Sequence, residues 1–281
     1  MTTNNFQKKE IRDRMAETGE AYSIAARAIA RESTWVSFPW FSFNKLAGKI
    51  NPQGLYVFAS RNGVGKTTVA LNLALHLVEQ GGIAYYANME MTESQLRNRI
   101  IATGAGISPL DLEAKPINES VAKKIETFNN SFRGDIVIDK TATSQTVDNI
   151  IAETRKLATG GNLKVIVIDY LQLLEPIFGT SADRNNAIAE TVHKLHLLTI
   201  ELKVPIVILS QVLRSSAEIS VVYAFSRTAN IDLVQSSQLV VLIEESVKDT
   251  LTFHVTKNRS KRTGSVKLAI NREFMQVKDI S

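Results

Sequence analysis

The fold is decided by the stretch Ser60-Arg61-Asn62-Gly63-Val64-Gly65-Lys66-Thr67-Thr68, which lies between two apolar segments. The preceding run, 55–59, is typical of a buried strand, and 66–79 has the apolar spacing of a helix. A glycine-containing turn between a strand and a helix presents backbone N–H groups and the positive end of the helix dipole to an anion. The pattern therefore predicts a phosphate-binding loop, although Ser60 stands where the usual motif has its first glycine.

The side chains of this loop have separate expected roles in binding ATP and Mg²⁺. Lys66 would contact the β- and γ-phosphate oxygens, and the hydroxyl of Thr67 would ligate the metal ion. Asp169 ends an apolar strand, 164–168, and an acid at that place would orient Mg²⁺ through a bound water molecule. We expect all the residues from Ser60 to Thr68 to line the ATP site. The alternative interpretation is an ordinary strand-to-helix turn with a surface lysine.

Two more polar residues follow strands that should end at the same edge of the sheet. Glu90 comes after the predicted strand 83–88, and Gln211 comes after the predicted strand 205–209. Because parallel strands bring their carboxyl ends together, Glu90 could lie opposite the γ-phosphate and polarise the attacking water. Gln211 could contact the γ-phosphate. A carboxylate at a helix start and a structural turn are the respective alternatives.

Strands alternate with helices from residue 55 onward, which is typical of right-handed crossovers that build a mainly parallel sheet. After about residue 238 the strands become short and closely spaced, so we interpret them as antiparallel extensions at one edge. Helices are expected at 66–79, 92–103, 118–130, 146–158 and 184–202, and strands at 55–59, 83–88, 135–138, 164–168, 205–209, 239–243, 250–256, 265–270 and 275–278.

The N-terminal part of the chain has a different character. Residues 7–31 read as helical with an interruption at 18–20, and their narrow apolar stripe predicts an arm that packs on something else. An aromatic cluster between 35 and 43 indicates core or interface. We therefore divide the chain into 1–40, a helical arm with an aromatic linker, and 41–281, an α/β domain. The aromatic residues are Trp35, Phe38, Trp40, Phe41 and Phe43.

Composition places the chain among ordinary globular proteins. Its 281 residues are 44% hydrophobic and 22% charged, which suffices for one large α/β domain. The absence of cysteine excludes disulfides and thiolate metal sites and is compatible with the cytoplasm. No long apolar run predicts a membrane span, and residues 1–14 lack the apolar core of a signal peptide. A net charge of +5 permits a polyanionic partner without establishing one.

A basic run, Lys257-Asn258-Arg259-Ser260-Lys261-Arg262, lies between two of the late strands. Three interpretations compete for it. It could be a solvated hairpin, a nucleic-acid patch, or a source of cations for the nucleotide of a neighbouring subunit. Composition alone does not choose among them.

Taken together, these segments resemble the C-terminal motor domain of DnaB-type replicative helicases, within the RecA-like ATPases. The resemblance runs from about Phe41 to the C-terminus and implies a RecA-like three-layer core. The run from Asp169 to Leu173 is more specific to that family than the phosphate loop. The markers are Gly63-Val64-Gly65-Lys66-Thr67-Thr68, Met89-Glu90-Met91, Ile168-Asp169-Tyr170-Leu171-Gln172-Leu173, Val204-Pro205-Ile206-Val207-Ile208-Leu209-Ser210-Gln211 and Lys257-Asn258-Arg259.

The resemblance also implies roles for single residues. In that family the glutamate that matches Glu90 activates water, and the glutamine that matches Gln211 senses the γ-phosphate. The residues that match Lys257 and Arg259 reach the ATP of the next subunit, so Arg259 would be an arginine finger acting in trans. The family forms hexameric rings around single-stranded DNA, which is contacted by loops facing the central channel.

By position those channel loops would be 176–186 and 213–230 here, with Arg214 and Arg227 as candidate phosphate contacts. The chain departs from the family at Ser236-Ser237-Gln238, where the family has an acidic segment. We also expect the family's N-terminal collar domain to be absent, with 1–40 in its place and the arm 7–31 docking on a neighbouring subunit.

The function expected from the sequence is an ATP-dependent ring helicase that translocates on single-stranded DNA in the replication of a plasmid, phage or mobile element. A replication initiator or loader would be a partner. Two alternatives stay open. One is a DNA-dependent ATPase that does not unwind duplexes and acts as a loader or recombination accessory. The other is a nucleotide-gated scaffold, against which the glutamate at position 90 counts.

Overall fold

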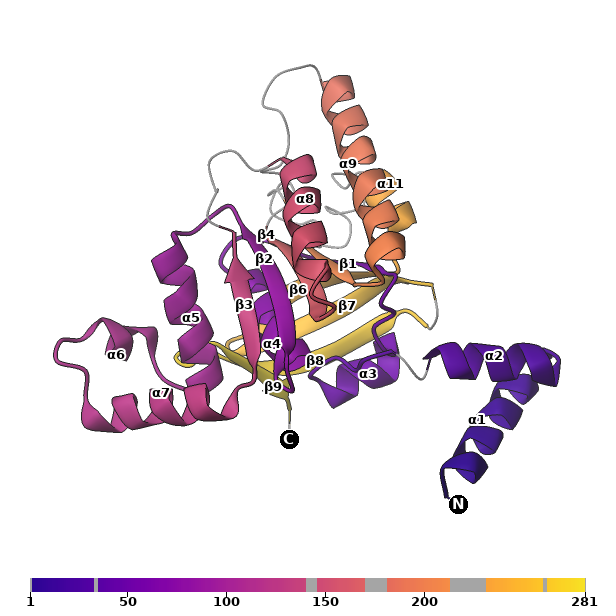
Figure 1. Ribbon diagram of the computed structural model, residues 1–281, viewed down its shortest axis with the longest axis horizontal. Helices are drawn as coiled ribbons and strands as arrows, with labels where there is room; N and C mark the ends of the chain where they lie inside the picture. Colours follow the sequence, from indigo (N-terminus) through magenta and orange to yellow (C-terminus); the bar gives the residue numbers. More distant parts are fainter. Residues whose placement is uncertain are drawn as a thin grey trace.

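The computed structural model describes residues 2–32, 35–139, 146–169, 181–212, 231–259 and 262–280. The described strands form one sheet in the order β3-β2-β4-β5-β1-β6-β7-β8-β9, with helices on both faces (Figure 1). The strands are β1 (Leu55–Ser60), β2 (Gly82–Asn88), β3 (Gly134–Ile138), β4 (Leu163–Asp169), β5 (Ile206–Gln211), β6 (Leu239–Val247), β7 (Thr250–Asn258), β8 (Gly264–Asn271) and β9 (Gln276–Asp279).

The described helices agree with the expected ones to within a few residues, and three short helices were not predicted. These are α3, α6 and α11, each of which is at most two turns long. The helices are α1 (Thr2–Thr18), α2 (Tyr22–Glu32), α3 (Phe41–Ala47), α4 (Lys66–Val78), α5 (Glu93–Ala105), α6 (Pro109–Glu113), α7 (Glu119–Ser131), α8 (Val147–Ala158), α9 (Ser181–Leu202) and α11 (Ile231–Ser236).

The sheet is mainly parallel with antiparallel strands at its C-terminal edge, as the sequence predicts. One detail of that prediction is wrong. Strand β6 is not antiparallel but pairs parallel with β1, in the register Tyr56↔Leu239, and the antiparallel part begins at β7. The physical reason lies in its first half. The side chains from Leu239 to Ile243 are buried on both faces of the sheet, as in the central parallel strands.

Helices cover the two faces of the sheet with separate hydrophobic clusters. Alternate residues of β1 face opposite sides, so Phe58 packs with α3, α4 and α5, whereas Val57 packs with α8, α9 and α11. Figure 1 shows α4 on one side of the sheet and α8 and α9 on the other. The expected three-layer α/β architecture is therefore confirmed, and the carboxyl ends of the parallel strands share one edge.

The aromatic segment that precedes α3 belongs to the core. Phe38, Trp40 and Phe43 are 2%, 1% and 0% exposed. The indole Nε1–H of Trp40 donates to the carbonyl oxygen of Val277 at 2.9 Å, and its ring meets that of Phe253 edge to face at 5.3 Å. The segment thus attaches the start of the α/β domain to its last strand. The sequence predicted either a core or an interface role for this segment, and the burial of these three rings shows that they belong to the core.

The N-terminal arm is a hairpin of two helices. Its break falls at Gly19, which has a φ of +71°, a conformation that glycine adopts without strain. Ile11 and Ala25 are buried between α1 and α2, whereas Ile24 is 54% exposed. Figure 1 shows the hairpin projecting away from the sheet. The helical arm is therefore confirmed as an element, and the side chains of Tyr22 and Ile24 in α2 are exposed to solvent.

The two expected channel loops are only partly described. Residues 181–186 belong to α9, so the loop expected at 176–186 is wrong in its second half. A serine and an aspartate at the start of that segment are residues that favour a helix N-terminus. Residues 176–180 and 213–230, with Arg214 and Arg227, lie outside the described residues. Among the described helices, none is long and apolar enough to span a membrane.

Candidate phosphate and metal site

The loop between β1 and α4 has the conformation that an anion cradle needs. Gly63 and Gly65 have φ angles of +78° and +117°, in the region that residues with a Cβ rarely adopt. A Cβ at Gly65 would also lie 3.1 Å from Cδ1 of Ile270, which packs against the loop from β8. The helix that follows begins at Lys66, so its free N–H groups face the hollow of the loop.

Lys66 is held at the centre of this loop. Its side chain is buried, and Nζ donates to the carbonyl oxygens of Ser60 and Arg61 and to Oγ of Ser60, each at 3.3 Å. Burial lowers the pKa of Lys66, whereas the nearby carboxylates of Asp169 and Glu90 act in the opposite direction. A buried ammonium that contacts neutral oxygens would be stabilised by an added phosphate. Ser60, the departure from the usual motif, supplies two of those three oxygens, its carbonyl and its hydroxyl.

Asp169 lies beside Thr67 at the end of β4. The hydroxyl of Thr67 donates to Oδ2 of Asp169 at 2.9 Å, and the hydroxyl of Tyr86 donates to the same oxygen at 2.8 Å. The carboxyl group is fully buried, which raises the pKa of Asp169. Its other oxygen, Oδ1, has no hydrogen-bond partner among the described residues.

These oxygens fit a small divalent cation. The hydroxyl of Thr67 and the carboxylate oxygens of Asp169, one of which has no partner among the described residues, are hard oxygen ligands of the kind that Mg²⁺ prefers. A buried carboxylate oxygen with nothing to bind is costly, and a cation would remove that cost. Thr67 and Asp169 would hold the ion, directly or through its bound water. No described group of three or more His, Asp or Glu side chains offers a different metal site.

A pocket of about 380 Å³ opens beside the loop and gathers residues from four parts of the chain. Glu90 lies on its wall and is exposed, two residues beyond the end of β2. Arg272 reaches it from the turn after β8, where its guanidinium pairs with Glu245 at 2.7 Å and donates to the carbonyl oxygen of Gly63 at 3.4 Å. The lining residues are Asn62, Gly63, Gly65, Lys66, Thr67, Thr68, Glu90, Met91, Arg99, Ile270, Arg272 and Met275.

The structure brings the predicted residues Lys66, Thr67, Glu90 and Asp169 together, and it places Gln211 next to them. Gln211 pairs in register with Ser60, so it lies level with the start of the loop. The sequence analysis missed Tyr86, Arg99 and Arg272. No local signal marks these residues, because each reaches the site from a strand, helix or turn whose pairing with the loop is set by the sheet.

Lys257 and Arg259 lie at the opposite end of the sheet. The backbone N–H of Arg259 donates to Gln238, and that of Gln238 donates to Leu55, at the start of β1. The guanidinium of Arg259 donates to the carbonyl oxygen of Gln235 at 2.6 Å, and Nζ of Lys257 donates to the same oxygen at 2.7 Å. Within one chain, these two cations are therefore bound to the C-terminal end of α11 and not to the phosphate loop.

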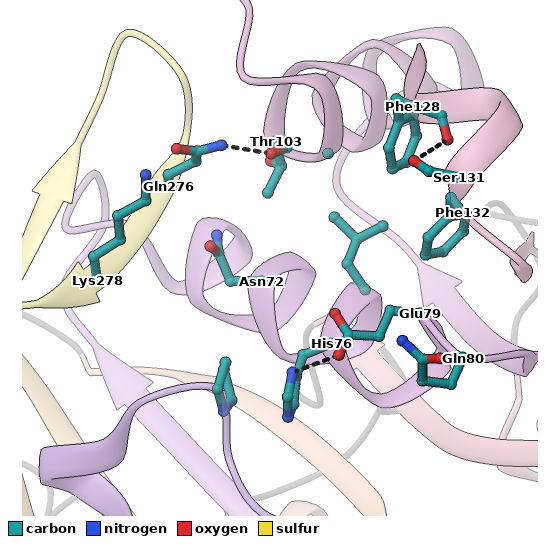
Figure 2. A pocket seen from close by; sticks show the side chains of 13 residues that line it. Asn72, His76, Glu79, Gln80, Thr103, Phe128, Ser131, Phe132, Gln276 and Lys278 are labelled. Carbon is teal, nitrogen blue, oxygen red and sulfur yellow. Dashed lines mark hydrogen bonds and ion pairs between the residues drawn. The ribbon is translucent and has the colours of Figure 1, made fainter. Parts of the chain in front are cut away.

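A second pocket, of about 430 Å³, lies at the other end of α4 (Figure 2). Some of its polar side chains already have partners within the chain: His76 pairs with Glu79, and the side chain of Gln276 donates to the backbone carbonyl oxygen of Thr103. Ten residues of helix separate His76 from Lys66, a distance of about 15 Å. This pocket is therefore not part of the phosphate site.

Comparisons with known proteins agree with this geometry. The sequence profile of the DnaB-like helicase C terminal domain matches residues 39–279. A probable plasmid replicative DNA helicase of Chlamydia psittaci is 34% identical over 164 residues, which are 56% of this chain and 34% of that protein. The replicative DNA helicase DnaB of Geobacillus stearothermophilus is 25% identical over 258 residues, 86% of this chain and 56% of that protein.

A solved structure of a DnaB-like replicative helicase, studied with its interactions with primase, has the same fold. It superposes with a TM-score of 0.77 at 20% identity, covering 99% of this chain and 77% of that one. This likeness confirms the fold class. The chain spans between a third and a little over half of the length of the two curated helicases named above.

Proposed function

This chain belongs to the family of the DnaB-like helicase C terminal domain, and we propose that it is an ATP-driven motor that translocates on single-stranded DNA. The observation that carries the proposal is the cluster of Lys66, Thr67 and Asp169 at the carboxyl edge of a parallel sheet. A buried ammonium, a helix N-terminus and a hydroxyl–carboxylate pair are the parts that bind a nucleotide triphosphate with its metal ion.

Each residue of the site has a distinct part in the proposed hydrolysis of ATP. Lys66 and the loop N–H groups would bind the β- and γ-phosphate oxygens. Thr67 and Asp169 would hold Mg²⁺, which when bound neutralises charge on the phosphates. The exposed carboxylate of Glu90 would accept a proton from the attacking water, and Gln211 would contact the γ-phosphate.

We further infer that the site is completed by a neighbouring subunit. Arg259 and Lys257 are too far from the loop of their own chain to contact its nucleotide, but a head-to-tail neighbour could present them to it. A head-to-tail contact that closes gives a ring, and we propose a hexamer. The exposed side of α2 in the N-terminal arm is the proposed docking surface for that neighbour.

Single-stranded DNA is the proposed track, and the basic net charge of the chain is compatible with it. Arg214 and Arg227 remain candidate contacts to its phosphates. A replication initiator or loader is the proposed partner, and the cytoplasm the proposed location. A motor of this kind would couple loss of the γ-phosphate to movement of one subunit relative to the next.

The experiment that tests the proposal measures ATP hydrolysis with and without single-stranded DNA, alongside native mass at the same ATP concentrations. Stimulation of several-fold together with a six-subunit species supports a translocating ring, and strand displacement would then be measured. An unstimulated rate in a monomer contradicts the motor and points to an accessory ATPase. Lys66→Ala is the control, because hydrolysis that survives this change does not come from the proposed site.

A further inference from the structure

We propose that Tyr86 is a positioning residue for the cation site, and that its buried hydroxyl fixes the carboxylate of Asp169 beside Thr67. The inference rests on the proposed nucleotide-hydrolysing function and names one more residue on which that function depends. Tyr86 lies in β2, the strand next to β4, which ends at Asp169.

The hydrogen bonds at Asp169 explain why the tyrosine matters. Oδ2 accepts two hydroxyl donors, from Thr67 at 2.9 Å and from Tyr86 at 2.8 Å. Two donors on one oxygen prevent the carboxyl group from rotating. They also leave Oδ1, which has no hydrogen-bond partner among the residues that the structure describes, as the oxygen available to a cation or its bound water.

The phenol can only donate in this place. Tyr86 is completely buried, and its hydroxyl lies 2.8 Å from Oδ2 of Asp169. A phenol hydroxyl beside a carboxylate donates to it, so Tyr86 orients Asp169 rather than competing with it for the cation. Because the side chain is shielded from solvent, a water molecule does not readily replace a hydroxyl that is removed.

The neighbouring residue shows that a buried tyrosine on β2 need not serve the site. Tyr85 is 1% exposed, but it points to the other face of the sheet, and its hydroxyl donates to Asp139, just after β3. Tyr86 instead packs in the cluster that contains α4, the helix that begins with Lys66 and Thr67. A tyrosine retained for packing alone could be replaced by phenylalanine at either position, whereas a positioning role makes Tyr86 different.

The test compares Tyr86→Phe with the matched control Tyr85→Phe, in the full chain. A fluorescent ADP analogue reports nucleotide binding as Mg²⁺ is titrated, and a parallel measurement in EDTA reports binding without metal. We expect Tyr86→Phe to keep its metal-free nucleotide affinity and to need about 10-fold to 100-fold more Mg²⁺ for half-saturation. Direct Mn²⁺ binding, followed by electron paramagnetic resonance, should weaken to a similar extent. Tyr85→Phe should behave as the wild type.

The outcomes separate this inference from the proposed function. An unchanged Mg²⁺ midpoint in a folded Tyr86→Phe protein, or an equal shift in Tyr85→Phe, overturns the positioning role alone. A wild-type chain that binds no nucleotide with or without Mg²⁺ overturns the proposed function itself. Thermal unfolding shows whether the variants are folded. Tyr86→Met, in which a flexible apolar side chain fills the space, must show the same increase as Tyr86→Phe.

Discussion

Replacing Arg259 by alanine tests whether the site is completed by a second subunit. The guanidinium is exposed and donates to the carbonyl oxygen of Gln235, so its loss should leave the fold intact. We expect Arg259→Ala to bind ATP with unchanged affinity and to hydrolyse it about 10³-fold more slowly, the lower end of what an arginine finger contributes. The guanidinium would contact the negative charge that develops in the transition state. Its loss therefore slows hydrolysis without weakening the binding of ATP in the ground state.

The structure explains why this arginine cannot act on its own nucleotide. Arg259 lies level with Leu55, and β1 continues for five more residues to Ser60 before the phosphate loop begins. At about 3.3 Å per residue this separation is about 17 Å. An extended arginine side chain reaches about 7 Å from its Cα. A rate loss in Arg259→Ala must therefore come from a site on another chain.

The assay mixes two inactive variants. Arg259→Ala and Glu90→Gln are each measured alone and then combined in equal amounts under conditions that exchange subunits. In a head-to-tail ring, about one quarter of the interfaces then join an intact glutamate to an intact arginine. The mixture should recover up to about one quarter of the wild-type ATPase rate if interfaces act independently.

Two results would refute this reasoning. One is a mixture that stays as inactive as its components although native mass shows exchanged subunits. The other is an Arg259→Ala protein that hydrolyses ATP at the wild-type rate. A Lys248→Ala variant serves as a control for general loss of positive charge, because Lys248 is an exposed cation at the far end of the β6–β7 hairpin from Arg259.

Single contacts in the site and in the core give four further predictions. Lys66→Ala should abolish ATP binding in a filter or fluorescence assay, because the ammonium at the centre of the loop is lost; tight binding would contradict the assignment. Glu90→Gln should bind ATP and hydrolyse it about 10²-fold to 10⁴-fold more slowly in a single-turnover assay. Burial raises the pKa of Asp169, so the folded chain binds this proton more tightly than the unfolded chain does. The carboxyl group of Asp169 therefore lowers the free energy of unfolding at neutral pH. Asp169→Asn should therefore raise the metal-free melting temperature at pH 7, by about 2 °C or more, and this gain should shrink as the pH falls toward the ordinary aspartate value; a gain independent of pH would be inconsistent with this cause. Trp40→Phe, which loses the hydrogen bond to Val277, should cost about 1 kcal/mol in urea unfolding, and Trp40→Ala about 3–5 kcal/mol; equal costs would mean that the ring contributes nothing.

Much of the fold could be predicted because its signals are local. Apolar runs of strand length, helical spacing between them and a glycine-containing turn each lie within about 15 consecutive residues. The short helices were missed because one or two turns carry too little periodicity. The direction of β6 was misjudged because a strand's neighbours depend on where the preceding crossover returns, which for β6 is beside β1 in the middle of the sheet.

The sequence by itself determined the phosphate loop, the acid at the end of β4 and the glutamate after β2. Each lies at or just beyond the carboxyl end of an apolar strand. Parallel strands bring their carboxyl ends to one edge of the sheet. Only the tertiary structure decided that Tyr86 shares an oxygen of Asp169 with Thr67, that Arg272 touches Gly63, and that Arg259 lies at the far end of the sheet. These contacts and positions involve residues that are far apart in the sequence. They depend on the order and register of the strands in the sheet, which no local sequence pattern indicates.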